Sequence, residues 1–101
     1  MKVIAFTENH DLPEGVDQAA QVSEAGQILN DLHERGILER VFLRKDVPGV
    51  VMMMECGTLE DAHQYMEAFP GVKNGSTSYQ LTPLGTEIPP NAFLGFRMVS
   101  S

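Results

Sequence analysis

The stretch TENHDLPEG, residues 7–15, lies between an apolar run and a helical pattern. It contains side chains that could transfer protons. Glu8 and His10 lie just after the apolar run at residues 3–6, where a first strand is expected to end. A carboxylate or an imidazole in such a loop can move a proton, as isomerisation beside a carbonyl group requires. We therefore take His10 and Glu8 as candidate catalytic residues. The alternative is an ordinary loop that leads into a capped helix.

Asp11 fits that structural alternative. Glu14 follows it by three residues, the spacing of a capping box, and Pro13 suits the first turn of a helix. The sequence therefore predicts a helix from about Pro13 to Arg35, capped by Asp11. Apolar residues at three- and four-residue steps predict its buried face: Ala19, Val22, Ala25, Ile28, Leu29 and Leu32.

Two arginines offer a second kind of chemistry. Residues 37–46, ILERVFLRKD, are rich in branched and aromatic side chains and predict a strand. Steps of two along it place four side chains on one side: Leu38, Arg40, Phe42 and Arg44. Because the planar guanidinium group matches a carboxylate, Arg40 and Arg44 facing an enclosed space predict binding of a small organic anion. The alternative is that both pair with acids such as Glu39, Glu55 or those of a neighbouring subunit.

The last predicted strand, TSYQLTPL at residues 77–84, presents polar side chains to the same side of the sheet. Ser78 and Gln80 alternate there with Tyr79 and Leu81, which suit a face covered by helices. We therefore add Ser78 and Gln80 to Arg40 and Arg44 as candidate substrate-binding residues.

The order of the remaining elements predicts the fold. Residues 50–56, VVMMMEC, predict a strand paired with the preceding one, and a helix capped by Thr58 follows and ends at Pro70. The order βαββαβ is that of the ferredoxin-like unit, an α+β fold in which two helices cover one face of a four-stranded antiparallel sheet.

The other face of this sheet predicts self-association. VVMMM does not alternate between apolar and polar residues, so both faces of the sheet are expected to be covered. Two sheets packed face to face form a dimeric α+β barrel, and we expect a homodimer or higher homo-oligomer. Residues 1–84 form the expected domain. The tail at 85–101, with AFLGF at 92–96, is expected to dock on a neighbouring subunit.

Composition excludes several classes of partner. The 101 residues are enough for one domain and carry a net charge of −7, which argues against nucleic acid and anionic membrane surfaces. One cysteine, Cys56, and an N-terminus without a signal-peptide pattern predict a cytoplasmic protein. Three scattered histidines predict no metal site.

Several short segments resemble the muconolactone isomerase family. They are HDLP at 10–13, ERG at 34–36, the strand with Arg40 and Arg44, TLEDAHQYMEAFP at 58–70 and YQLTPL at 79–84. The resemblance implies a ferredoxin-like chain that assembles through its sheet face into a dimeric α+β barrel. It also implies an enzyme without a cofactor that moves a double bond within a lactone carboxylate by proton transfer.

The resulting hypothesis is a cofactor-free isomerase of a small carboxylated ring compound. Arg40 and Arg44 would hold the carboxylate, while His10 or Glu8 moves the proton. Two alternatives are a cofactor-independent small-barrel monooxygenase and a non-enzymatic protein that binds a small ligand or serves assembly.

Overall fold

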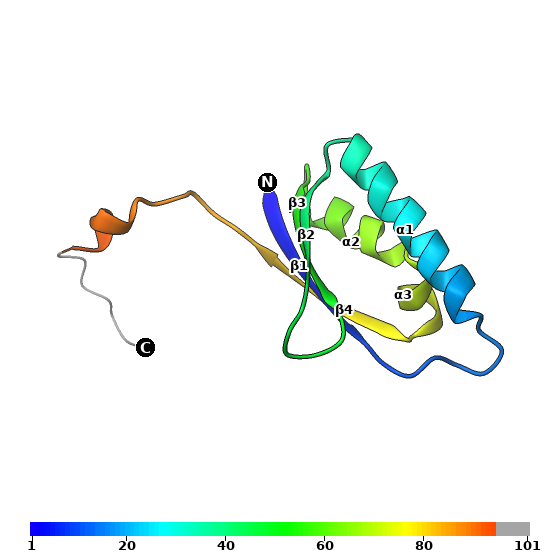
Figure 1. Ribbon diagram of the computed structural model, residues 1–101. Helices are drawn as coiled ribbons and strands as arrows, with labels where there is room; N and C mark the ends of the chain where they lie inside the picture. The colour runs from blue at the N-terminus through cyan, green and yellow to red at the C-terminus, as the bar shows by residue number, and fades with distance from the viewer. Residues whose placement is uncertain (95–101) are drawn as a thin grey trace.

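Helices cover one face of a four-stranded antiparallel sheet in the computed structural model, which describes residues 1–94 (Figure 1). The elements are β1 (Lys2–Asn9), α1 (Gln18–Glu34), β2 (Leu38–Leu43), β3 (Val50–Glu55), α2 (Leu59–Glu67), α3 (Pro70–Asn74), β4 (Thr77–Pro83) and η1 (Pro90–Phe93). The strands lie in the order β2-β3-β1-β4, and each pairs antiparallel with its neighbours. The predicted ferredoxin-like fold is confirmed, with the short helix α3 as an unpredicted addition after Pro70.

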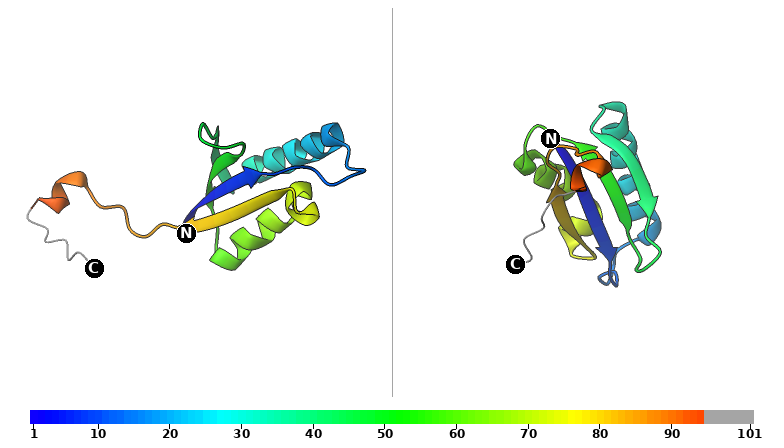
Figure 2. Two further views of the ribbon diagram at one scale, coloured as in Figure 1. Left: turned by 90° about the horizontal axis from the view of Figure 1, so that it is seen from below. Right: turned by 90° about the vertical axis from the view of Figure 1, so that its left-hand side faces the viewer.

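Alternate residues of the strands point to two different faces. Val3 and Ala5 of β1 are fully buried beneath the helices, as are Met52 and Met54 of β3. Met66 of α2 packs in the same core. The right-hand view of Figure 2 looks onto the opposite face, which α1, α2 and α3 leave uncovered. We call this second face the open face.

The open face is partly apolar, as the sequence of β3 predicts. Hydrogen-bonded pairing places Phe42, Val51 and Phe6 side by side across three strands, and Met53 next to Ile4 in the row beside them. Phe42 is 51% exposed, and the other four side chains are partly buried. These two rows of apolar side chains place β1 and β3 at the centre of an uncovered apolar surface.

A β-bulge in β2 corrects the predicted faces of that strand. Leu38 pairs with Met54 while Arg40 pairs with Met53, so the register shifts by one residue between them. Leu38 therefore points into the core, where it is 4% exposed, and not to the side of Arg40. Simple counting in steps of two fails here because it assumes an unbroken strand.

The first helix begins later than predicted, and Asp17 caps it in place of Asp11. The Asp17 carboxylate accepts hydrogen bonds from the backbone N–H groups of Ala19 at 3.0 Å and Ala20 at 3.3 Å. Gly15 has a left-handed φ of 81°, which ends any helix that would start at Pro13. The capping prediction for Asp11 was therefore wrong, and residues 10–17 form a loop.

The N-terminal half of α1 does not bury its predicted face. Ala19 is exposed and Val22 is 63% exposed, whereas Leu32 near the other end is 2% exposed. Ala25 and Leu29 between them are partly buried. The helix therefore packs tightly at its C-terminal end only. Within residues 1–94, no helix is both long and apolar enough to cross a bilayer.

The chain beyond β4 leaves the sheet. Leu84 still donates a backbone hydrogen bond to the carbonyl of Lys2, at 2.8 Å, and residues 85–92 are exposed. Figure 1 shows this segment, which ends in η1, extending away from the sheet and helices. Docking of residues 85–101 on a neighbouring subunit stays a prediction, and residues 95–101 lie outside the described part of the chain.

The hairpin between β2 and β3 crosses close to the end of β1. The Thr7 hydroxyl accepts a hydrogen bond from the backbone N–H of Val50 at 2.9 Å, and Asn9 N–H donates to the Pro48 carbonyl at 2.7 Å. A Cβ atom on Gly49 would overlap the carbonyl oxygen of Thr7. Glycine at position 49 thus permits the hairpin to lie against β1.

Replacing Gly49 with alanine is expected to lower the free energy of unfolding by about 2–4 kcal/mol, since the methyl group must push the hairpin away from Thr7. Gly26→Ala in α1 is the control, because nothing lies within 4 Å of its added carbon. That substitution should stabilise the helix by up to ~1 kcal/mol. Urea unfolding of both variants measures the difference, and equal stability of the two would contradict the described packing.

Candidate functional site

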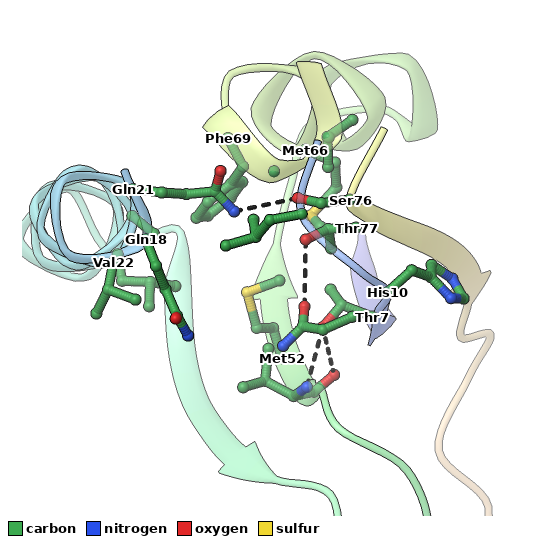
Figure 3. A pocket seen from close by; sticks show the side chains of 17 residues that line it. Thr7, His10, Gln18, Gln21, Val22, Met52, Met66, Phe69, Ser76 and Thr77 are labelled. Atoms are coloured by element: carbon green, nitrogen blue, oxygen red, sulfur yellow. Dashed lines mark hydrogen bonds between the residues drawn. The ribbon is translucent and has the colours of Figure 1, made fainter. Parts of the chain in front are cut away.

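A cavity of about 260 Å³ lies between α1 and the sheet (Figure 3). Its apolar wall consists of Leu12, Val22, Ala25, Leu29, Val50, Met52, Met66, Phe69 and Val72. A cavity of about 150 Å³ is sufficient to bind benzene, so this one has room for a single substituted ring. We call it the helix-side cavity. It exists because the N-terminal half of α1 stands away from the sheet.

Uncharged polar groups form one end of the helix-side cavity. The Gln21 side chain accepts a hydrogen bond from Asn74 Nδ2 at 2.6 Å and donates one from Nε2 to Ser76 Oγ at 3.2 Å. Ser76 is 2% exposed, and its backbone N–H donates to Asn74 Oδ1 at 2.9 Å. This closed network ties α1 to the segment between α3 and β4 and fixes the Gln21 amide at the cavity wall.

Gln21 and Ser76 were missed by the sequence analysis, although one signal pointed to Gln21. It stands four residues before Ala25 and eight before Leu29, so a polar residue occupies a position of the apolar helix face. A polar side chain at a core position needs a partner. The partners Asn74 and Ser76 lie more than fifty residues away, so local spacing does not reveal them.

His10 is the one titratable side chain in the wall of the helix-side cavity. Its backbone N–H donates to the Ser76 carbonyl at 2.7 Å, and its ring nitrogen Nε2 lies 3.0 Å from Ser78 Oγ, within hydrogen-bond distance. In Figure 3 the imidazole lies at the rim of the cavity and is directed away from its centre. Ser78 thus orients the ring of His10.

A second candidate site is a shallow depression on the open face. It is lined by Phe6, Glu8, Arg44, Ser78, Tyr79 and Gln80. The pairing of β1 with β4 places Glu8 opposite Ser78 and Phe6 opposite Gln80. Four predicted site residues (Glu8, Arg44, Ser78 and Gln80) therefore lie together, and His10 joins them through Ser78. Arg40 does not line the depression, because it lies farther along β2, opposite Met53.

Arg44 is already paired within the chain. Its Nε and Nη2 atoms donate to the two carboxylate oxygens of Asp46 at 3.0 and 2.7 Å, and Nη1 donates to the Thr7 carbonyl at 3.2 Å. The guanidinium carbon lies 6.0 Å from the centre of the Phe6 ring. Glu39 and Glu55, which were expected as possible partners of the arginines, pair with Lys2 and with the N-terminal amine, respectively. An external carboxylate would therefore compete with Asp46 for Arg44.

The Arg44–Asp46 contact changes the acid titration of both groups. The hydrogen bonds from Arg44 lower the pKa of Asp46 to about 2, and the bonds to Asp46 raise the pKa of Arg44. Both groups stay charged across the neutral range. The open-face depression therefore carries a fixed cation beside the Glu8 carboxyl.

A separate chain of hydrogen bonds lies where α2 meets β4. The Tyr79 hydroxyl donates to Glu67 at 2.9 Å and lies 2.9 Å from His63 Nδ1. Burial, and then the contact with Glu67, raises the pKa of Tyr79. His63 is exposed to solvent on its other side. Within residues 1–94, no three His, Cys, Asp or Glu side chains gather at a place that could hold a metal ion.

One solved structure is similar in fold to this chain. It is 5-chloro-2-hydroxyhydroquinone dehydrochlorinase (TftG) from Burkholderia phenoliruptrix AC1100, in complex with 2,5-dihydroxybenzoquinone. The TM-score is 0.59 at 14% sequence identity, over 86% of this chain and 96% of that one. No family model and no curated protein match the sequence. At this identity the likeness confirms the fold and nothing narrower.

The low pKa of Asp46 predicts how the stability changes in acid. An unfolded aspartate has a pKa near 3.9, so between about pH 4 and pH 2 the folded chain binds fewer protons than the unfolded chain. The stabilisation by the pair is complete above about pH 4 and is lost as the pH falls toward 2. In Asp46→Asn, melting temperatures should therefore fall less steeply over this range than in the parent.

Glu14→Gln, in the loop before α1, is the control for this experiment, because it removes one negative charge from an exposed position. Its melting temperatures should keep the steepness of the parent curve between pH 4 and pH 2. Equal curves for Asp46→Asn and the parent would contradict the stabilising role of the pair.

Proposed function

We propose that the protein is an enzyme that moves a proton on a small ring compound bound in the helix-side cavity. The observation that carries this proposal is the cavity itself: it has the size of one substituted ring, apolar walls and one uncharged polar end. Its one titratable wall residue, His10, belongs to the residue type that most often transfers protons in enzymes.

The nature of the wall indicates the substrate class. No Asp, Glu, Lys or Arg lines the helix-side cavity, so the part of the substrate inside is an uncharged ring with hydroxyl or carbonyl groups. The TftG complex supports this class, since 2,5-dihydroxybenzoquinone is a six-membered ring with such groups and is bound by a protein of the same fold.

Gln21 and His10 have different roles in the proposed reaction. Gln21 Nε2 carries two N–H groups, of which Ser76 takes one, and the other can donate to a substrate oxygen as negative charge develops on it. The imidazole of His10, which is directed away from the cavity in the free protein, turns toward the mouth, takes a proton from the ring atom there and returns it to a neighbouring atom. The proton is conserved, so this isomerisation needs no oxidant and no cofactor.

A carboxylated ring compound is the narrower proposal, in keeping with the resemblance to the muconolactone isomerase family. Its carboxylate would extend past His10 toward the open-face depression, where Ser78, Gln80 and the unpaired N–H groups of Arg44 could bind it. Glu8 is the alternative proton carrier on that side. Arg40 has no place in this arrangement unless a second copy contributes it.

Replacing His10 with glutamine is expected to lower the rate of proton transfer by about 10²- to 10⁴-fold while the cavity still binds its ligand. The measurement is exchange of ring C–H for deuterium in D₂O, followed by NMR, on a panel of hydroxylated benzenes, hydroxybenzoates and cyclic ketones. His63→Gln is the matched control, because His63 lies outside the cavity wall.

Other outcomes of the same panel would contradict the proposal. Binding without exchange in the parent protein would indicate a ligand-binding protein, and oxygen uptake with the phenols would indicate a monooxygenase. Arg44→Ala tests the narrower proposal: it should weaken binding of the hydroxybenzoates and leave that of the uncharged phenols unchanged. Equal weakening of both would exclude a carboxylate role for Arg44.

We also propose that two copies assemble through the open face, as a homodimer or as the unit of a larger homo-oligomer. The partly exposed row of Phe42, Val51 and Phe6 supports this proposal, since water-exposed apolar surface of this kind is typical of interfaces. The second copy would also cover the open-face depression.

Val51→Lys is expected to weaken self-association at least tenfold, because it places a charge at the centre of the apolar row. Sedimentation velocity over a range of concentrations measures the dissociation constant. Gln64→Lys, which adds the same charge to the exposed side of α2, should leave it unchanged. A parent protein that sediments as a monomer at every concentration would reject the proposal.

A further inference from the structure

The free edge of β2 exposes three consecutive apolar residues. Val41 is 44% exposed, Phe42 51% and Leu43 85%. Successive strand residues point to opposite faces, and the pairing with β3 places Val41 on the helix side and Phe42 on the open face. A partner lying on one face could not cover all three. What they share is the edge of the sheet, where β2 is the last strand.

The segment after β4 is exposed in the same way. Residues 84–89, LGTEIP, which we call the arm, include Leu84 and Ile88, 39% and 55% exposed. Of its backbone N–H groups only that of Leu84 has a backbone partner within the described residues, and at its far end the Pro89 carbonyl accepts from Ala92. Pro89 and Pro90 have no N–H and end the stretch that can pair. The arm thus offers four residues, 85–88, whose N–H groups are free, and its apolar side chains Leu84 and Ile88 are four positions apart.

The arm cannot reach the free edge of its own β2 along its observed path. One row of paired residues runs across the four strands: Leu38, Met54, Val3 and Pro83. The end of β4 is therefore level with the start of β2. Leu43 lies at the opposite end of the sheet, and β2 and β4 are opposite edges. The arm continues away from the sheet, as Figure 1 shows. The available β2 edge is therefore that of a second copy.

Charge favours the same contact. Residues 39–46, which include the exposed edge residues, carry the basic Arg40, Arg44 and Lys45 and the acidic Glu39 and Asp46, a net charge of +1. Residues 84–94 contain Glu87 and no basic residue. In a chain with a net charge of −7, an arm that carries one acid and an edge segment with a small net positive charge are complementary.

A second contact would also add to the area that the open face alone can bury. Four strands of about six residues present roughly 400 Å² in flat projection, and more as accessible surface. A stable interface usually buries about 800 Å² from each partner. Docking of a strand formed by residues 85–88 would add main-chain hydrogen bonds and the burial of Leu43 and Ile88 to such an interface.

We propose that the arm of one copy adds as an extra strand to the free β2 edge of a second copy, and that two such contacts are exchanged within a symmetric dimer. This inference goes beyond the proposed reaction and does not depend on it. It requires self-association, but its edge residues differ from the open-face residue Val51.

Cysteine cross-linking tests the arm contact directly. Leu43→Cys and Ile88→Cys, made in separate copies and mixed, are expected to form a disulfide between chains on oxidation, since the native Cys56 is buried. Ser23→Cys on the exposed side of α1 replaces Leu43→Cys in the control mixture and should give no cross-link with Ile88→Cys. No cross-link above this control, or one formed within a single doubly substituted chain only, would overturn the proposal.

Sedimentation of point variants provides the second measurement. Leu43→Lys and Ile88→Ser should each weaken association about tenfold, while Thr86→Ser should have little effect. Loss of association in Val51→Lys with no change in Leu43→Lys and Ile88→Ser would keep the open-face dimer and reject the arm contact. Deuterium exchange, which tests the proposed reaction, is measured independently of sedimentation. A protein without exchange activity could therefore still confirm or reject the arm contact.

Discussion

The alternation of side chains along β1 is the constraint on which both candidate sites depend. Thr7 points beneath the helices and lines the helix-side cavity, while Glu8 points to the opposite side and lines the open-face depression. His10 follows them and is held at the boundary by Ser76 and Ser78. A shift of one residue in the pairing of β1 would exchange the two sets. The hairpin that packs against Thr7 at Gly49 helps to fix this register.

The helix-side cavity exists because α1 is only half packed. Its C-terminal half buries Leu32 against the sheet, whereas Val22 in the other half is largely exposed. Closing the gap would bury more apolar surface and stabilise the fold. The partly buried network of Gln21, Asn74 and Ser76 ties the helix to the chain before β4, and no buried polar side chain of the described residues lacks a partner. A folded chain that keeps such a gap fits a binding role better than a purely structural one.

Local patterns predict only part of this arrangement. The element order, Thr58 as a cap and the grouping of Arg44, Ser78 and Gln80 follow from periods and turn residues that a few neighbours determine, whereas Glu8 was expected after the first strand and lies within β1. The bulge before Arg40 and the late start of α1 at Asp17 do not, because each depends on a choice between two local conformations that tertiary packing decides. The cavity is the least predictable feature, since its polar end joins residues more than fifty positions apart.

The pairing of Arg44 with Asp46 changes what its position on the open face implies. Because the two residues are close in sequence, the pair needs no partner subunit, and it holds the guanidinium group near Phe6. Desolvating this pair under a second copy costs less than burying a lone arginine, since Asp46 already compensates its charge. The same pairing reduces the affinity of Arg44 for an outside carboxylate. The arginine is therefore better suited to a covered sheet than its charge alone suggests, and the helix-side cavity is the better place for the ring of a substrate.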